Sequence, residues 1–381
     1  MVVFGDTQSD AGRRFNAPAS FVFEDIGPFP WTKLYEAPDS ESKFRAYLPG
    51  PGSVTNGKMW TEWLRVPQEL NFATHTASAT EMFRSRETCL GYTGEGEDFP
   101  TGTLDEQITR YLHEVDLEET RDYTHVIYIG NQDANEHTAA GLRYAAGGDD
   151  YEDPYIPFDQ LFTVVNGTVQ NNYGPLIAGL GVAWQAGISR LIEAGVTGRI
   201  LLGNIGNPEG FEQYFGTPVA EFVRLVALEI SIIAQSVADE FPEQVRILDN
   251  FALMSAVVDQ PEIFESLGFY APEGGILLSP CLVPDFQLDV GGEISGTQAL
   301  RPPGCQEECA LCADTTSPCQ TCFEGNPSAQ VCSDPDSRLF WANRSFSNAF
   351  HLIYGEAIRL CSKDSPDYDR PWVELMCPPS S

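Results

Sequence analysis

Short apolar runs alternate along the chain with longer stretches in which apolar residues recur every three or four positions. The runs predict buried strands at 1–5, 125–130, 199–203, 245–248 and 339–341. The longer stretches predict helices at 59–70, 103–115, 158–170, 174–195, 218–240 and 347–360. Thr103 stands where the second of these helices needs an N-cap. The alternation is typical of a parallel sheet with helices on both faces.

The order of these elements predicts an α/β fold in one domain, 1–381. Its natural form is a three-layer αβα sandwich around a central parallel sheet. Right-handed crossovers bring the carboxyl ends of the strands to one edge, so we expect functional residues there. A cysteine-rich segment at about 303–333 is too short to bury a core of its own, and we interpret it as a C-terminal insertion within the domain.

Charge narrows the range of partners. The chain has 55 acidic and 22 basic residues, for a formal net charge of −33. Such a chain repels phosphate backbones and anionic lipids, which argues against nucleic-acid and membrane binding. It has no uninterrupted apolar run of about 18 residues, so we expect no membrane span. The acidic surface favours solubility and would attract Ca²⁺, basic proteins or cationic polymers.

Ten cysteines, six of them between 305 and 332, favour disulfides and an oxidising compartment. They are Cys89, Cys281, Cys305, Cys309, Cys312, Cys319, Cys322, Cys332, Cys361 and Cys377. We expect most or all of them to be paired. A zinc site from the two CxxC units that begin at Cys309 and Cys319 is the alternative, but the spacer is short and the neighbouring cysteines favour bridges.

Other features bear on metals and on secretion. The acidic stretch Asp149, Asp150, Glu152 and Asp153 lacks the spacing of a calcium loop, so we expect a solvated loop and neither a metal nor a cofactor. Two N-glycosylation sequons, at Asn166 and Asn343, agree with a secreted or cell-surface glycoprotein. The chain opens on a strand without a signal peptide, so we expect a processed or trimmed N-terminus.

Five segments carry family motifs. The first, 2–12, reads VVFGDTQSDAG, and the second, 56–64, reads NGKMWTEWL. The next two are NFATHTA at 71–77 and YIGNQD at 128–133. The last, CSDPDSRLFW, spans 332–341. Together these segments, which are spread over most of the chain, resemble the blocks of the GDSL or SGNH hydrolases, in particular the plant-type members.

The resemblance implies an ester hydrolase, an esterase or lipase, on a flavodoxin-like sandwich. Its serine nucleophile, two oxyanion donors and Asp–His pair would fall on five positions. Here those positions hold Thr7, Thr76, Gln132, Ala342 and Ser345. A hydroxyl is a poor nucleophile until an oriented base removes its proton, and both the base and its orienter are replaced. We therefore interpret the chain as a pseudoenzyme.

We expect the altered positions to converge in a cleft at the carboxyl ends of the strands. This relic cleft comprises Asp6, Thr7, Thr76, Asn131, Gln132 and Ser345. Asn131 is adjacent to the oxyanion asparagine position and could partly substitute, but in a strand-end turn we expect its side chain to point elsewhere. His75 is the one credible replacement base, whereas His351 matches no motif position.

Two functions remain open. The first is a non-catalytic extracellular protein that binds a glycan or a protein partner through the relic cleft, or assembles with itself through its acidic surface. The second is a divergent hydrolase of lipid esters or acetylated sugars with Thr7 as the nucleophile. Three aspartates follow the strands: Asp6, Asp10 and Asp133. The alternative to a role in the site is a structural one, in which they accept hydrogen bonds from turn amides.

Overall fold

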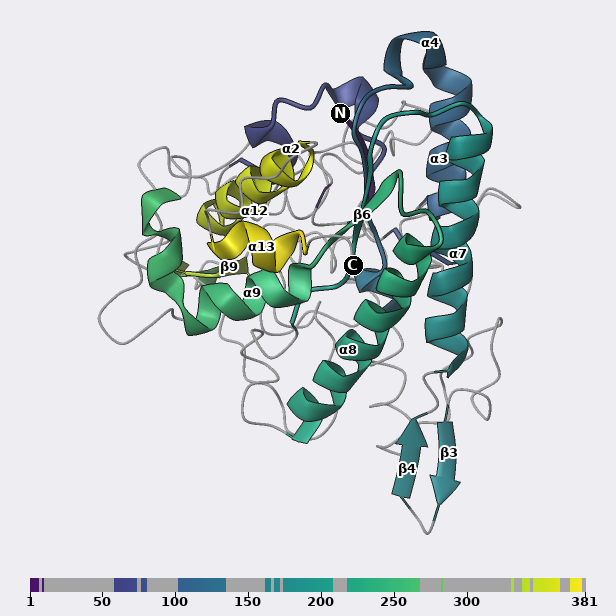
Figure 1. The fold of residues 1–381 in the computed structure, drawn as a ribbon. Coiled ribbons are helices and arrows are strands. Elements are labelled where there is room, and N and C mark those ends of the chain that lie inside the picture. The colour runs from purple at the N-terminus through teal and green to yellow at the C-terminus, as the bar shows by residue number, and fades with distance from the viewer. Residues whose placement is uncertain are drawn as a thin grey trace, which may run out of the picture.

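In a computed structural model, the structure is described for 1–6, 9, 58–73, 77–80, 102–134, 162–165, 168–171, 174–207, 218–267, 282–283, 330–331, 338–342, 345–363 and 371–378. Its centre is a sheet of four parallel strands, shown in Figure 1. They are β1 (Val2–Gly5), β2 (His125–Tyr128), β5 (Ile200–Gly203) and β6 (Val245–Leu248), in the order β1-β2-β5-β6. A parallel bridge from Val3 to Asn71 extends the sheet beyond β1.

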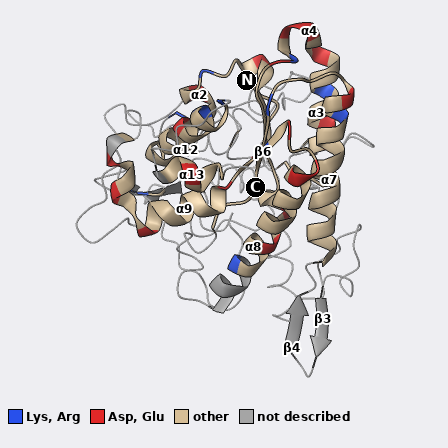
Figure 2. Cartoon of the chain, in the orientation of Figure 1, with Lys and Arg blue, Asp and Glu red and all other residues tan. Residues whose placement is uncertain are grey.

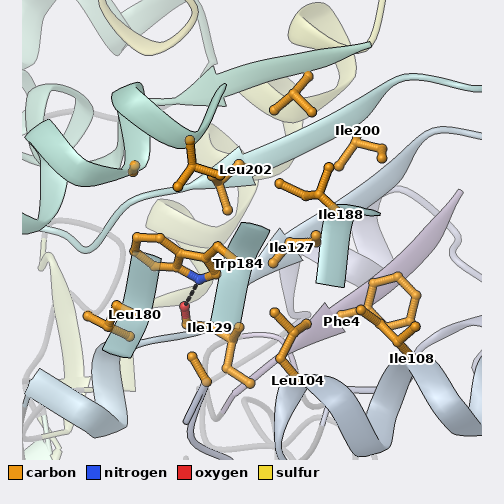
Figure 3. Close-up of a cluster of buried hydrophobic side chains, with 14 of the residues drawn as sticks. Phe4, Leu104, Ile108, Ile127, Ile129, Leu180, Trp184, Ile188, Ile200 and Leu202 are labelled. Carbon is orange, nitrogen blue, oxygen red and sulfur yellow. Dashed lines mark hydrogen bonds between the residues drawn. The ribbon is translucent and has the colours of Figure 1, made fainter. Parts of the chain in front are cut away.

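One face of the sheet is covered by α3 (Leu104–Glu114), α7 (Gly174–Glu193) and α8 (Pro218–Asp239). Alternate strand residues, such as Phe4, Ile127 and Leu202, point into this layer, as Figure 3 shows. The Trp184 indole packs among them and donates to the Ile129 carbonyl at 3.1 Å. Gly187 lets α7 approach α3, because a Cβ there would lie 2.9 Å from the Ile108 side chain.

The other face is covered by α2 (Trp60–Trp63), α9 (Asn250–Asp259), α12 (Asn348–Cys361) and α13 (Pro371–Met376). The intervening strand residues, Val3, Val126 and Leu201, point into this second layer. Because both faces are buried, the strands are continuous apolar runs without polar alternation. The α/β class, with a parallel sheet between helical layers, is as the sequence predicts.

Most of the predicted elements are confirmed to within a few residues. The strands at 125–130, 199–203 and 245–248 correspond to β2, β5 and β6, and the last match is complete. Thr103 caps α3 as expected: its hydroxyl accepts from the Glu106 amide at 3.3 Å, and the Glu106 carboxylate accepts from the Thr103 amide at 2.9 Å. The strand at 339–341 corresponds to β9 (Phe340–Ala342), which pairs with β10 (Ser345–Phe346).

The helix predicted at 158–170 is wrong. This region holds an antiparallel hairpin of β3 (Phe162–Val165) and β4 (Thr168–Asn171), seen in Figure 1 beyond the start of α7. Val165 pairs with Thr168, which leaves Asn166 and Gly167 as a two-residue connection. Asn-Gly is a strong hairpin-turn signal, and the flanking β-branched residues favour strands over helix.

The helix predicted at 59–70 is also wrong beyond its first turn. It ends at Trp63 because Arg65 adopts a left-handed conformation and Pro67 cannot continue a helix. A short 3₁₀ turn, η2 (Gln68–Leu70), follows before the chain joins the sheet at Asn71.

The remaining described elements are short. They are α4 (Leu117–Thr120), η4 (Pro261–Leu267) and the strand pair β7 (Leu282–Val283) and β8 (Gln330–Val331). By length and composition, α7 is the one described helix apolar enough to cross a bilayer. Its apolar side chains Leu180, Trp184 and Ile188 are buried against the sheet, so α7 is a core helix of the sandwich.

A disulfide closes the second layer. Cys361 ends α12, Cys377 follows α13, and the two are bonded with their Cα atoms 5.8 Å apart. The predicted pairing of cysteines is thereby confirmed for these two. The other eight cysteines, and with them the insertion at about 303–333, lie outside the described residues apart from 330–331.

We predict that removing this disulfide destabilises the protein by about 3 kcal/mol, because a loop of roughly 15 residues loses that much closure entropy when it is cross-linked. The test is urea unfolding of the double variant Cys361→Ala, Cys377→Ala. Peptide mapping without reductant should yield the two segments as one cross-linked species. An unchanged unfolding midpoint, or free thiols at both positions, would contradict the prediction.

Candidate functional site

Polar residues follow each strand of the sheet at its carboxyl end. Asp6 follows β1, Asn131 lies just beyond β2, Asn204 follows β5 and Asp249 follows β6. Asp6 and Asn204 are both 1% exposed, so these groups face the interior of the edge. The sequence predicts the relic cleft at this edge.

Asp6 and Asn131 form the centre of this edge. The Asp6 carboxylate oxygen Oδ2 accepts from the Asn131 side-chain amide at 2.9 Å and from its backbone amide at 3.3 Å. Asn131 begins a helical turn, 131–134, and its side chain turns back to the end of β1. The expectation that it points away from the oxyanion position stays a prediction. The segments that contain the first and fourth motif blocks are thus joined beside position 7.

The negative charge of Asp6 affects the pKa of two buried tyrosines. Burial raises the pKa of Tyr128, and the negative charge of Asp6 raises it further. The same two causes act on the pKa of Tyr354, whose ring lies 5.2 Å from that of Tyr128. Both phenols therefore stay neutral, and neither supplies a base for a neighbouring hydroxyl.

Asp133 has a structural role, in which its carboxylate holds a turn in place. Its carboxylate accepts from the Ala79 amide at 2.6 Å, the Thr80 amide at 3.1 Å and the Thr80 hydroxyl at 2.6 Å. Burial raises its pKa to about 6, although these hydrogen bonds favour the ionised form. Asp133 thereby fixes the end of the third block against the fourth. Gln132, at the oxyanion position, is half-buried beside it.

The segment that follows β1 is held in place by residues for which the motifs predicted no such role. The side chain of Gln107 donates to the Gly5 carbonyl at 2.9 Å and accepts from the Gly5 amide at 2.8 Å. Ser9 accepts twice: its carbonyl from Asn71 at 2.9 Å, and its hydroxyl from the Trp60 indole at 3.3 Å. A polar residue in the buried face of a predicted helix was the available signal for Gln107.

Asn204 is a second residue that sequence analysis missed. Its oxygen accepts from the Asn250 amide at 2.6 Å and the Phe251 amide at 3.3 Å. Its nitrogen donates to the Ser231 hydroxyl and the Asp249 carboxylate, both at 2.9 Å. These bonds use both the oxygen and the nitrogen of the side chain and join the start of α9 to Ser231 of α8, so Asn204 has a structural role rather than that of a free ligand-binding group. Its place directly after a buried strand was the signal.

The fifth block ends on β9 of the small β9–β10 hairpin. Ala342 and Ser345, at the positions where the resemblance would place Asp and His, are partners in the strand register. Ser347 follows and caps α12, with its hydroxyl accepting from the Phe350 amide at 3.2 Å. The hairpin thus leads directly into the helix that packs against Tyr128.

The described histidines are His113, His125 and His351, and none of these three bonds a carboxylate. His125 lies at the amino end of β2 and contacts the Tyr111 hydroxyl at 2.9 Å and the Tyr123 carbonyl at 2.8 Å. His351 is 1% exposed on α12, and neither ring nitrogen has a hydrogen-bond partner. Burial lowers the pKa of His351 to about 3 and that of His125 to about 4.

Several predicted site residues lie outside the described residues. They are Thr7, Thr76, the replacement base His75, the sequon asparagines Asn166 and Asn343, and the acidic stretch 149–153. Within the described part of the chain, no three His, Cys, Asp or Glu side chains gather as metal ligands would. The structure therefore brings together Asp6 and Asn131, and places Ala342 beside Ser345.

A scan against protein-family models and a search of curated proteins gave no match to this chain. The resemblance to GDSL hydrolases therefore rests on the motif residues and stays a prediction.

We predict that His351→Leu raises the free energy of unfolding at pH 7 by on the order of 1–3 kcal/mol, because it removes two buried nitrogens that lack partners. It should also weaken the loss of stability in acid. The wild-type folded state takes up the His351 proton only near pH 3, whereas the unfolded chain does so at the ordinary value of 6.5. Stability is thus complete above about pH 6.5 and falls as the pH drops towards 3.

The measurement is urea unfolding between pH 4 and pH 8. His113→Leu, at an exposed position of α3, is the matched control and should stay within about 0.5 kcal/mol of wild type. A His351→Leu variant that is less stable than wild type at pH 7 would show that the imidazole has a partner.

Proposed function

We propose that this chain is a catalytically inactive, extracellular relative of the GDSL or SGNH hydrolases that binds a glycan or a protein partner. One observation carries the proposal. Among the described residues no histidine has the carboxylate partner that a general base needs, and the hairpin of the fifth block presents Ala342 and Ser345 as a pair. The hydroxyl expected at position 7 would therefore lack activation.

The sheet supports the family assignment. Counting the Asn71 segment as the second strand in chain order, the strands run 2-1-3-4-5, the order of flavodoxin-like sheets. In such sheets ligands bind outside the carboxyl ends, next to the point where the strand order reverses. Here that point lies between β1 and β2, where Asp6 meets Asn131.

The chemistry of the cleft residues favours binding without turnover. Threonine, glutamine, asparagine and serine side chains offer hydroxyl and amide groups that suit sugar hydroxyls, and none is a large apolar plug. A secreted setting agrees with the Cys361–Cys377 disulfide, because such bonds persist in oxidising compartments.

We predict no hydrolysis of p-nitrophenyl acetate or butyrate above background and no labelling of Thr7 by a fluorophosphonate probe. Losing a catalytic base alone costs about 10⁶ in kcat in a serine protease, and losing an oxyanion donor about 10²–10³. Labelling that disappears in Thr7→Ala would instead establish the divergent hydrolase. The double change Ala342→Asp with Ser345→His should restore at most weak activity, since Thr76 and Gln132 still replace oxyanion donors.

Binding is tested by a thermal-shift screen against a glycan panel. A ligand in the relic cleft should raise the melting temperature of wild type but not of Thr76→Trp, whose side chain would fill the cleft. Association that ignores this substitution and vanishes in salt would place the function on the acidic surface, because exposed charges are screened beyond about 10 Å at 0.1 M salt.

A further inference from the structure

The end of α2 has a backbone conformation that glycine would favour. The Val66 amide donates to the Thr61 carbonyl at 2.9 Å and the Arg65 amide to the Glu62 carbonyl at 3.1 Å, the bond pattern of a Schellman motif. In this motif the residue after the C-cap adopts the left-handed region and is usually glycine. Here it is Arg65, with φ of 53°, the one described non-glycine residue with positive φ.

An arginine at this position is a local cost to the fold, since its Cβ crowds the backbone in the left-handed region. Glycine would make the same two hydrogen bonds without that strain. Residues held in such conformations are concentrated at functional sites, so the side chain of Arg65 is the feature to explain.

Arg65 is exposed, two residues after an exposed aromatic ring. The Trp63 side chain, at 37% exposed, is the large apolar group of α2 that is open to solvent. The Lys58 ammonium lies 5.0 Å from the centroid of its indole. Lys58 and Arg65 are thus close in the chain to the same exposed ring, at opposite ends of α2.

Neither cation is paired with a carboxylate in the described part of the chain. In contrast, Arg110, Arg121, Arg190 and Arg359 pair with Glu114, Glu118, Asp105 and Glu356. The nearest acid in sequence, Glu62, accepts from the Met59 amide at 2.8 Å. In a chain with 55 acidic and 22 basic residues, it is unusual to find two exposed cations without a described acidic partner within seven residues of each other, one of them in contact with an exposed ring. Figure 2 shows acidic residues, in red, at other helices such as α4.

The helix that carries this surface is held in place. The Trp60 indole donates to the Ser9 hydroxyl at 3.3 Å, and the Lys58 amide donates to the Asn348 side chain at 3.0 Å. These bonds tie α2 and the residue before it to the first motif block and to the start of α12. A binding surface on α2 is therefore preorganised, with little ordering left for a ligand to impose.

We propose that Lys58, Trp63 and Arg65 form a binding surface for a uronate residue of an acidic saccharide. An aromatic face attracts the C–H groups of a sugar ring, and a guanidinium and an ammonium bind its carboxylate. The net charge of the chain repels anions at long range, but that repulsion is screened beyond about 10 Å at 0.1 M salt while these contacts act at short range. The inference rests on the proposed glycan-binding function and names its ligand class at a surface separate from the relic cleft residues.

The test uses isothermal titration of the full chain with α-1,4-linked trigalacturonate and with its fully methyl-esterified form, in 0.1 M NaCl. Wild type should bind the acid at least fivefold more tightly than the ester. Trp63→Ala and Arg65→Gly should each weaken binding of the acid at least fivefold, whereas Arg121→Gln, which removes a paired arginine on α4, should leave it unchanged. Arg65→Gly should at the same time raise Tm by about 1–2 °C, because it relieves the left-handed strain.

Two outcomes would overturn this surface. Arg65→Gly that binds as tightly as wild type, or equal binding of acid and ester, would show that the cations do not recognise a carboxylate. Loss of binding in Thr76→Trp with none in Trp63→Ala would place the saccharide in the relic cleft, which supports the proposed function while excluding α2. Failure of wild type to bind trigalacturonate would overturn the uronate surface alone, since the glycan panel tests the cleft independently.

Discussion

The turn that leaves β1 is the constraint on which the rest of the edge depends. Its residues are held by partners from separate parts of the fold: Gln107 of α3 binds Gly5, Asn131 beyond β2 binds Asp6, and Trp60 of α2 and Asn71 bind Ser9. Gly5 must lack a side chain, because a Cβ there would lie 2.7 Å from the Ser9 Cβ. Since each partner also belongs to the core, the position of this turn is coupled to both helical layers.

The two helical layers differ in how completely their buried polar groups are hydrogen-bonded. On the α3 side, His125, Tyr111 and Thr120 form a continuous hydrogen-bonded chain at 2.9 Å per contact. On the α12 side, His351 has no partner, and the Tyr354 hydroxyl lies beside Asn250 without a well-formed hydrogen bond. Unsatisfied groups cost about 1–3 kcal/mol each, so the layer next to the relic positions is the less optimised one. This is the pattern expected where residues were retained for a role other than stability.

The end of the chain completes the second layer and covers the open edge of the sheet. Arg246 of β6 donates to the Cys361 carbonyl at 2.7 Å and the Lys363 carbonyl at 2.9 Å. The Asp249 amide donates to the Met376 carbonyl at 2.7 Å, next to the Cys361–Cys377 bond. These contacts fasten the ends of α12 and α13 to β6, the edge strand of the described sheet.

How much was predictable depended on whether the cause was local. The apolar run at 245–248 identified β6 completely, and Thr103 identified the start of α3. Both signals are local, because the spacing of buried residues and the capping of a helix depend on residues that are neighbours in the sequence. The hairpin at 162–171 also had a local signal, the Asn166–Gly167 pair, but the spacing of the apolar residues led to the prediction of a helix there. In contrast, α9 was missed: Asp249 caps it locally, by accepting from the Ala252 amide at 3.0 Å, but its nearly continuous apolar run lacks the amphipathic spacing that identifies a helix.

The sequence by itself determined the chemistry of the motif positions: a threonine at 7, a glutamine at 132, and an alanine and a serine at 342 and 345. Only the tertiary structure decided that Asn131 turns back to Asp6, that His351 is buried without a partner, and that Arg65 takes the place of a glycine. The reason is physical. Residue identity limits which reactions are available, whereas orientation and burial arise from contacts between segments that lie far apart in the chain and meet only in the folded state.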